Sequence, residues 1–217
     1  MRLPDINSLK QYKETELIDI LKIKDVEPLS RHINLLTDKD KTKALIATEK
    51  QYIRPSLEYK AYIKYLKEYM DMTKCSFFDN VKASKRVKIE IHHSPFSLYD
   101  ITSVVAEKQM HDNGEFNYFK IAEEVLKLHY QCKVGLIPLS TTVHSLVHNG
   151  ELFIPLDAPR GDFISFIKEY DRYISNDLMS NLEQMLILSK QVQNLSLLNT
   201  KYTYMEVDGF TLPKIIE

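Results

Sequence analysis

The chain of 217 residues contains no tryptophan, only 5 glycines and only 2 cysteines. Cys75 and Cys132 lie far apart and show no Cys-x-x-Cys spacing, which argues against a disulfide framework or a redox motif. Met1 is followed by Arg-Leu-Pro-Asp instead of the apolar segment of a secretory signal, so we expect reduced thiols in a cytoplasm. The scarcity of glycine, together with abundant Lys, Ile, Tyr and Asn, is typical of an AT-rich genome, such as that of a low-GC bacterium or its phage.

The chain also lacks an excess of either charge, because it has 29 basic and 30 acidic residues. No overall field attracts nucleic acid or an anionic membrane, and any site for a polyanion must be local. Lys, Asp or Glu interrupts every hydrophobic run before it reaches the roughly 20 apolar residues of a membrane helix. We therefore expect a soluble protein without a membrane partner, as a monomer or a homo-oligomer.

The N-terminal part of the chain has helical patterns. Residues 14–23 favour a helix, although their β-branched side chains also fit a strand. Residues 38–52 predict a helix that ends before Pro55, because proline pushes the preceding residue out of the α region. Residues 56–72 predict a helix with an apolar, tyrosine-rich stripe opposite a row of lysines. We expect the stripe to be buried; the alternative is an aromatic and basic surface for nucleic acid.

The middle of the chain mixes strand and helix patterns. Residues 81–93 alternate between apolar and polar side chains, which predicts a half-buried strand that ends at two histidines. A helix is expected from its cap Asp100 to about Met110, followed by a turn at 111–114 and a second helix over 117–131.

A second strand and a short helix follow this helical insertion. The apolar run 135–140 predicts a strand, and Pro138 restricts it to an edge position or a bulge. Ser140 or Thr141 is the expected cap of a helix that ends at about His148, before a left-handed stop at Asn149-Gly150.

The C-terminal part is expected to be mostly helical. The patterns predict a strand at 152–156, helices at 162–174 and 177–192, and an extended tail over 202–216. No repeat or flexible linker divides the chain.

These elements predict a predominantly helical α+β protein of three regions. Residues 1–80 form a helical N-terminal region, 81–150 a core with a helical insertion at 99–133, and 151–217 a C-terminal region packed on the core.

Four of the seven histidines stand in two pairs. His144 and His148 are four residues apart, so on a helix they point the same way and can share one metal ion. His92 can supply a third ligand if its strand runs beside that helix, which leaves His93 free to take a proton from water. Glu90, two residues before His92, is a candidate partner that orients an imidazole. Three imidazoles favour Zn, Ni or Mn over Mg.

The segments around these histidines resemble the HNH, or ββα-metal, endonuclease family in its His-His…His-x-x-x-His form. They read Ile89-Glu-Ile-His-His-Ser-Pro and Gly135-Leu-Ile-Pro-Leu-Ser-Thr-Thr-Val-His-Ser-Leu-Val-His148. The resemblance implies a ββα-metal core, with His93 as the general base and His92, His144 and His148 as ligands of one divalent metal ion. The family's central asparagine falls on Gly135, so either another group orients His93 or the site is impaired.

A local basic stretch precedes the first histidine pair and is a candidate contact for a nucleic-acid backbone, with a solvated strand face as the alternative. Its members are Lys82, Lys85, Arg86 and Lys88. The remaining histidines have no partner in the sequence and are expected on the surface or in packing, with a minor alternative for His111 as an accessory ligand or DNA contact. They are His32, His111 and His129.

The leading prediction is a phage-encoded, metal-dependent endonuclease that hydrolyses DNA, or alternatively RNA, in the host cytoplasm. Two alternatives remain open at this stage. One is an inactive protein of the same fold, acting as a nucleic-acid-binding or assembly module with a structural metal, which the glycine at position 135 favours. The other is a helical interaction module whose histidines bind nothing and in which His92 lies far from His144.

Overall fold

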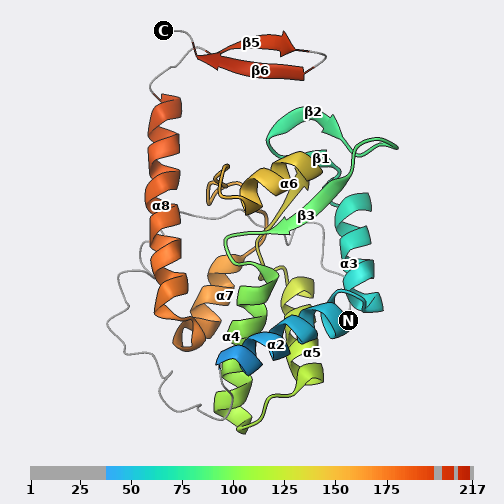
Figure 1. Ribbon diagram of the computed structural model, residues 1–217, viewed down its shortest axis with the longest axis vertical. Helices are drawn as coiled ribbons and strands as arrows, with labels where there is room; N and C mark the ends of the chain where they lie inside the picture. Colours follow the sequence, from blue (N-terminus) through green and yellow to red (C-terminus); the bar gives the residue numbers. More distant parts are fainter. Residues whose placement is uncertain (1–37, 198–201, 208–209, 216–217) are drawn as a thin grey trace.

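The computed structural model describes residues 38–197, 202–207 and 210–215. The chain is mixed α+β and mostly helical there, and its strands form small two-stranded sheets (Figure 1). The predicted predominantly helical α+β class is therefore confirmed, whereas the helix expected at 14–23 lies outside the described residues. None of the described helices combines the length and the apolar character that crossing a membrane requires.

The N-terminal helices form as expected. Helix α2 (Asp38–Ala47) continues into a π-helical turn, η3 (Thr48–Ile53), and α3 (Leu57–Glu68) follows after Pro55. The hydroxyl of Ser56 caps α3 by accepting a hydrogen bond from the backbone N–H of Tyr59. Most of the predicted apolar stripe is buried: Ile63 is half-buried, Tyr69 is 64% exposed, and the buried members are Tyr59, Tyr62, Leu66 and Met70. Tyr65, which the predicted stripe did not include, is buried as well.

The helical insertion consists of α4 (Leu98–Asn113) and α5 (Tyr118–Tyr130). Helix α4 begins at the cap Ser97, so the prediction that Asp100 is the cap is wrong. Asp100 instead accepts from the backbone of Ser97 while Ser97 accepts from that of Asp100, and this reciprocal capping box starts the helix three residues earlier. The helix also runs through most of the expected turn, ending at the left-handed Gly114.

Two strands distant in sequence form the sheet beside the candidate site. Strand β3 (Ile89–His93) pairs antiparallel with β4 (Leu136–Ser140), so that His93 lies opposite Leu136. Helix α6 (Thr141–His148) follows β4 directly, and the predicted Ser140 caps it. Helix α6 packs against both strands, and Figure 1 shows it next to β3. Pro138 fits because β4 is an edge strand of a two-stranded sheet.

Strand β3 is shorter than the predicted strand 81–93. A separate small sheet of β1 (Lys74–Cys75) and β2 (Phe78–Lys82) precedes it, and residues 83–88 form a turn. The hydroxyl of Ser84 accepts hydrogen bonds from the backbone of Arg86 and Val87. This local bonding competes with strand pairing, which is why the alternating pattern does not produce one long strand.

The C-terminal part contains α7 (Phe163–Tyr170), a 3-10 turn η4 (Asp171–Tyr173), α8 (Asn176–Leu197) and the antiparallel strands β5 (Tyr202–Val207) and β6 (Phe210–Ile215).

The strand predicted at 152–156 does not form, so that prediction is wrong. The backbone N–H of Leu156 donates to the hydroxyl of Ser189 on α8, 2.9 Å away. The backbone groups of Leu136 on β4 pair instead with Arg160, at 2.8 Å in both directions.

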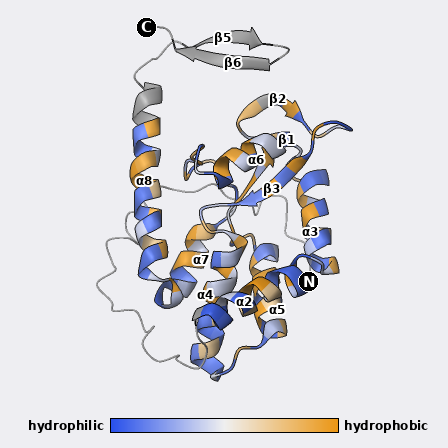
Figure 2. Ribbon diagram, viewed as in Figure 1, coloured by the Kyte–Doolittle hydropathy of each residue, from blue (hydrophilic) through white to orange (hydrophobic). Residues whose placement is uncertain are grey.

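The buried side chains form two hydrophobic clusters. The larger one joins buried side chains of α2, η3, α3, α4, α5, α7 and α8. Figure 2 shows that α7 is mostly hydrophobic, whereas hydrophilic and hydrophobic residues alternate along the described part of α8. The smaller cluster lies where β3, β4 and α6 meet, and consists of Cys75, Ile89, Ile137, Leu139, Val143 and Ile154. The β3–β4 pair is thus covered on both faces, and one histidine of the pair His92-His93 lies on each face.

Candidate metal centre

Three of the predicted site histidines come together. One ligand nitrogen from each of His92, His144 and His148 lies within 4.8 Å of the others. The ring centroids of His92 are 5.0 Å from His144 and 5.1 Å from His148, and those of His144 and His148 are 4.4 Å apart. The Nε2 atoms of His144 and His148 are 3.2 Å apart. No Cys, Asp or Glu from the described ranges joins this cluster.

The backbone explains why these side chains converge. The cap Ser140 fixes the start of α6, and the spacing of four residues places His144 and His148 on one face of that helix. In the β3–β4 pair, His92 lies opposite Ile137, which packs with Val143 of α6 in the smaller cluster. Because side chains alternate along a strand, His92 points toward α6 and His93 points to the other face.

Glu90 stands two residues before His92 and supports the cluster from the same face. Its Oε2 lies 3.1 Å from Nδ1 of His144, and its Oε1 accepts from Lys88 at 2.5 Å. The hydrogen bond from Lys88 lowers the pKa of the Glu90 carboxyl, so Glu90 is charged at neutral pH. A carboxylate at Nδ1 leaves the Nε2 of His144 available to a metal ion.

Two histidines of the cluster, His92 and His144, are held in their neutral form. Burial, followed by repulsion from His144 and His148, lowers the pKa of His92 to about 4. Burial and then the neighbouring His148 lower the pKa of His144 as well. Neutral imidazole is the form that binds metal, so protons compete weakly at pH 7. His148 is exposed, and the cluster is therefore open to solvent.

The predicted base His93 lies apart from this cluster. It is 8% exposed, and its Nε2 is 2.9 Å from the Nε2 of His129 on α5. Nδ1 of His129 is 2.7 Å from the backbone oxygen of Val125. Burial, His129 and Arg54 lower the pKa of His93, and burial lowers that of His129 to about 4.

No sequence pattern assigned His129 a partner. The one available signal was its position among apolar residues on the buried face of α5, where a polar side chain requires a hydrogen-bond partner.

Gly135, at the position of the family asparagine, has no room for a side chain. A Cβ there would lie 1.9 Å from the backbone oxygen of Ser94, the residue after His93. The carbonyl of Gly135 accepts from the N–H of Ser94 at 3.0 Å, so the backbone itself secures this loop.

The predicted basic residues gather on the turn between β2 and β3. All four are exposed, and three of them line a groove of about 300 Å³ together with Lys67 of α3. Nζ of Lys67 donates to the backbone oxygen of Ile89 at 3.0 Å, which fixes this turn beside α3. The three are Lys85, Arg86 and Lys88, and Lys82 ends strand β2.

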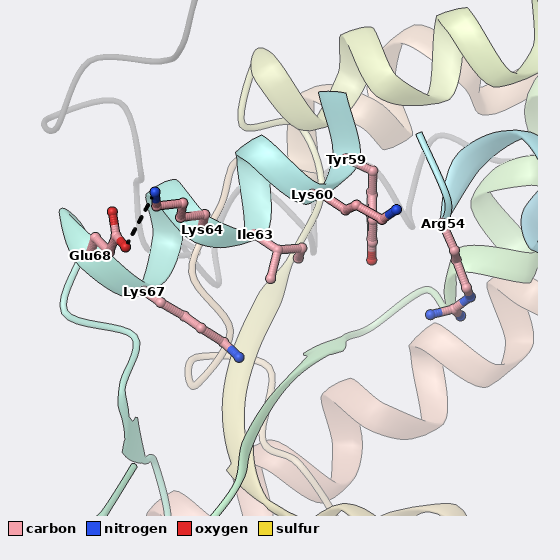
Figure 3. A pocket seen from close by; sticks show the side chains of 7 residues that line it. All are labelled: Arg54, Tyr59, Lys60, Ile63, Lys64, Lys67 and Glu68. Atoms are coloured by element: carbon pink, nitrogen blue, oxygen red, sulfur yellow. Dashed lines mark ion pairs between the residues drawn. The ribbon is translucent and has the colours of Figure 1, made fainter. Parts of the chain in front are cut away.

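A second basic groove, of about 410 Å³, runs along α3 and shares Lys67 with the first (Figure 3). Arg54 stands at one end, and the ring of Tyr59 in its wall lies 5.6 Å from that of His129. Lys64 in this groove is paired with Glu68 at 3.8 Å. The lysines opposite the buried stripe of α3 therefore continue the basic surface of the turn. The groove is lined by Arg54, Tyr59, Lys60, Ile63, Lys64, Lys67 and Glu68.

Two further histidines were expected on the surface or in packing, with a minor alternative role as ligand or DNA contact for His111 alone. His111 is exposed and pairs with Asp112 at 3.1 Å, outside the three-histidine cluster. His32 lies outside the described residues.

Comparison with known proteins adds one match. No curated protein and no solved structure matches the chain. A family model for bacteriophage G278-like virion proteins matches residues 4–209, almost the whole sequence. The match supports the predicted phage origin, and it carries no information on nuclease chemistry. The chain belongs to the bacteriophage G278-like virion protein family.

Proposed function

We propose that this phage protein is a metal-dependent phosphodiester hydrolase of the HNH type, with a ββα-metal core formed by β3, β4 and α6. The observation that carries the proposal is the convergence of ligand nitrogens from His92, His144 and His148 within 4.8 Å beside solvent. Structural zinc sites are closed by four protein ligands, whereas catalytic sites keep three and leave one position open. Three imidazoles without a fourth ligand from the described residues correspond to the open kind.

The donor set fits a divalent transition metal such as Zn, Ni or Mn, with Mg as a weaker candidate. Such an ion, when bound, supplies positive charge that stabilises a phosphate and its departing oxygen. Glu90 orients His144, and the basic turn holds a nucleic-acid backbone next to the cluster, DNA first and RNA as the alternative. His93, which adjoins His92 on β3, is the proposed base that takes the proton from the attacking water.

Cleavage assays with matched variants test this proposal. Supercoiled DNA and single-stranded RNA are incubated with the full chain and Mg, Mn, Ni or Zn. Wild type and the control His111→Ala, whose side chain lies outside the cluster, should both cleave. His144→Ala should lose metal binding and cleavage together, whereas His93→Gln should lose cleavage and keep the metal. Intact substrates with wild type and every metal would show that the hydrolase proposal is wrong.

Two observations favour a second function, an assembly or nucleic-acid-binding module with a structural metal. His93 is buried against His129, and Gly135 leaves no room for the family asparagine. This candidate predicts that a chelator lowers the melting temperature of the chain and that no metal produces cleavage. The alternative in which the histidines bind nothing is not favoured, because the rings of His92 and His144 are only 5.0 Å apart.

A further inference from the structure

The contact between His93 and His129 joins two buried histidines that are 36 residues apart in sequence. The side chain of His129 is inaccessible to solvent, and the rings of Tyr59 and Tyr62 pack edge-on against it, each at 5.6 Å. A leucine would fill such an apolar site at lower cost, because a buried imidazole must keep its polar atoms bonded. Both nitrogens of His129 are indeed bonded, one to Val125 and one to His93.

These contacts determine where the protons lie. A carbonyl oxygen only accepts, so Nδ1 of His129, 2.7 Å from the Val125 oxygen, carries a hydrogen. A charged imidazolium is costly in a buried site without a carboxylate, so Nε2 of a neutral His129 is an acceptor. The Nε2 of His93, 2.9 Å away, must then donate to it. Neutral His93 consequently keeps its basic lone pair on Nδ1.

We propose that His129 is the positioning residue of His93: it holds the His93 ring by Nε2–H and makes Nδ1 the basic nitrogen. The catalytic part of this inference rests on the proposed function, in which His93 is the base. His129 then performs from α5 the orienting role that no side chain at position 135 can perform, because the Gly135 backbone is in contact with Ser94. The helical insertion between the two strands of the core thus contributes a residue to the site.

The tautomer can be read without any activity measurement. Full-length protein labelled with 15N-histidine gives two-bond proton–nitrogen correlations that distinguish Nδ1–H from Nε2–H for each ring. We expect neutral His93 and His129 in wild type, protonated at Nε2 and Nδ1 respectively. In His129→Gln the amide oxygen can still accept from His93, so its tautomer should persist. In His129→Leu the acceptor is gone and the Nε2–H preference of His93 should disappear.

Kinetics then separate positioning from packing. His129→Leu should lower kcat by about 10- to 100-fold with little change in KM, as removal of an orienting partner does, and His129→Gln should recover most of it. Metal affinity should match wild type in both variants, because His129 does not belong to the three-histidine cluster. Melting curves verify that both variants fold.

Two results would overturn the inference: a wild-type His93 protonated at Nδ1, or a His129→Leu variant that changes the tautomer and leaves kcat intact. If wild type cleaves nothing, the proposed function fails, and the tautomer measurement still decides whether His129 positions His93.

Discussion

Oε2 of Glu90 lies 3.1 Å from Nδ1 of His144, which links a charged carboxylate on β3 to a candidate metal ligand on α6. The carboxylate fixes the orientation and the tautomer of the His144 ring, and it makes Nε2 of His144 a better ligand for a metal ion. The same side chain is tied to Lys88 through Oε1. Strand, helix and basic turn therefore meet at Glu90.

Removing this carboxylate should weaken metal binding. Glu90→Ala loses both the charge and the acceptor, so we expect a drop in Zn affinity of about 10- to 100-fold. Glu90→Gln keeps an acceptor and should lose less. Isothermal titration with the full chain measures both, and Lys88→Gln is the control because it removes the ion pair and keeps the carboxylate. Equal affinity in wild type and Glu90→Ala would contradict a role of Glu90 in holding His144.

The parts of the site that depend on short stretches of sequence could be predicted. The order of strand, cap and helix, and the spacing of His144 and His148, are local patterns, and the structure has Ser140 as the cap. The opposite directions of His92 and His93 follow from strand alternation alone.

The partners of these residues were not all predictable, because tertiary packing supplies them. His129 is brought to His93 by the packing of α5, which no pattern in either segment encodes. The turn at 83–88 shows the other limit, since one hydroxyl, that of Ser84, ends an alternating pattern that otherwise predicts a continuous strand.

Acid should destabilise the chain through His129. Burial lowers its pKa to about 4, against about 6.5 in the unfolded chain, so between these values the unfolded state binds the proton and the folded state does not. The free energy of unfolding should fall by about 3 kcal/mol as pH drops from about 6.5 to about 4, with no such loss above this window. Urea unfolding across pH 4 to 7.5, with a chelator present, measures the change.

His129→Gln is the matched comparison, since glutamine does not titrate in this range. Other histidines also titrate, and those that do not contact His129 cancel in the difference between the two pH curves. The difference therefore reports His129 together with its neighbour His93, whose pKa His129 lowers. Parallel curves for wild type and His129→Gln would contradict a lowered pKa for this residue.

Restoring a side chain at position 135 should harm the protein. A Cβ would lie 1.9 Å from the Ser94 oxygen and 3.1 Å from the Phe163 ring, so Gly135→Ala should cost at least the upper part of the roughly 1–3 kcal/mol typical of overpacking. Gly135→Asn should be no better and should not raise any cleavage activity. Gly114→Ala is the control: its φ of 70° is left-handed but the space around it is open, so we expect a loss of about 1 kcal/mol. Thermal unfolding ranks them, and a Gly135→Ala variant as stable as Gly114→Ala would contradict the close approach to Ser94.

Neutralising the basic turn should weaken nucleic-acid binding without affecting the metal ligands. The triple variant Lys82→Gln, Lys85→Gln, Arg86→Gln removes three exposed charges and leaves the Lys88–Glu90 pair in place. If these side chains bind phosphates, the slope of log affinity against log salt should fall by about 1 for each phosphate that is no longer neutralised. Fluorescence anisotropy with labelled duplex DNA at several salt concentrations measures this slope.

A charge-matched control distinguishes a local interface from general electrostatics. Exposed lysines on α2 and η3 provide it, as the triple variant Lys39→Gln, Lys43→Gln, Lys50→Gln. Both variants change the net charge of the chain equally, so a long-range effect of charge would weaken binding in both. Only direct binding at the turn predicts a reduced salt slope in the first variant alone, and equal slopes in the two would place the nucleic-acid interface elsewhere.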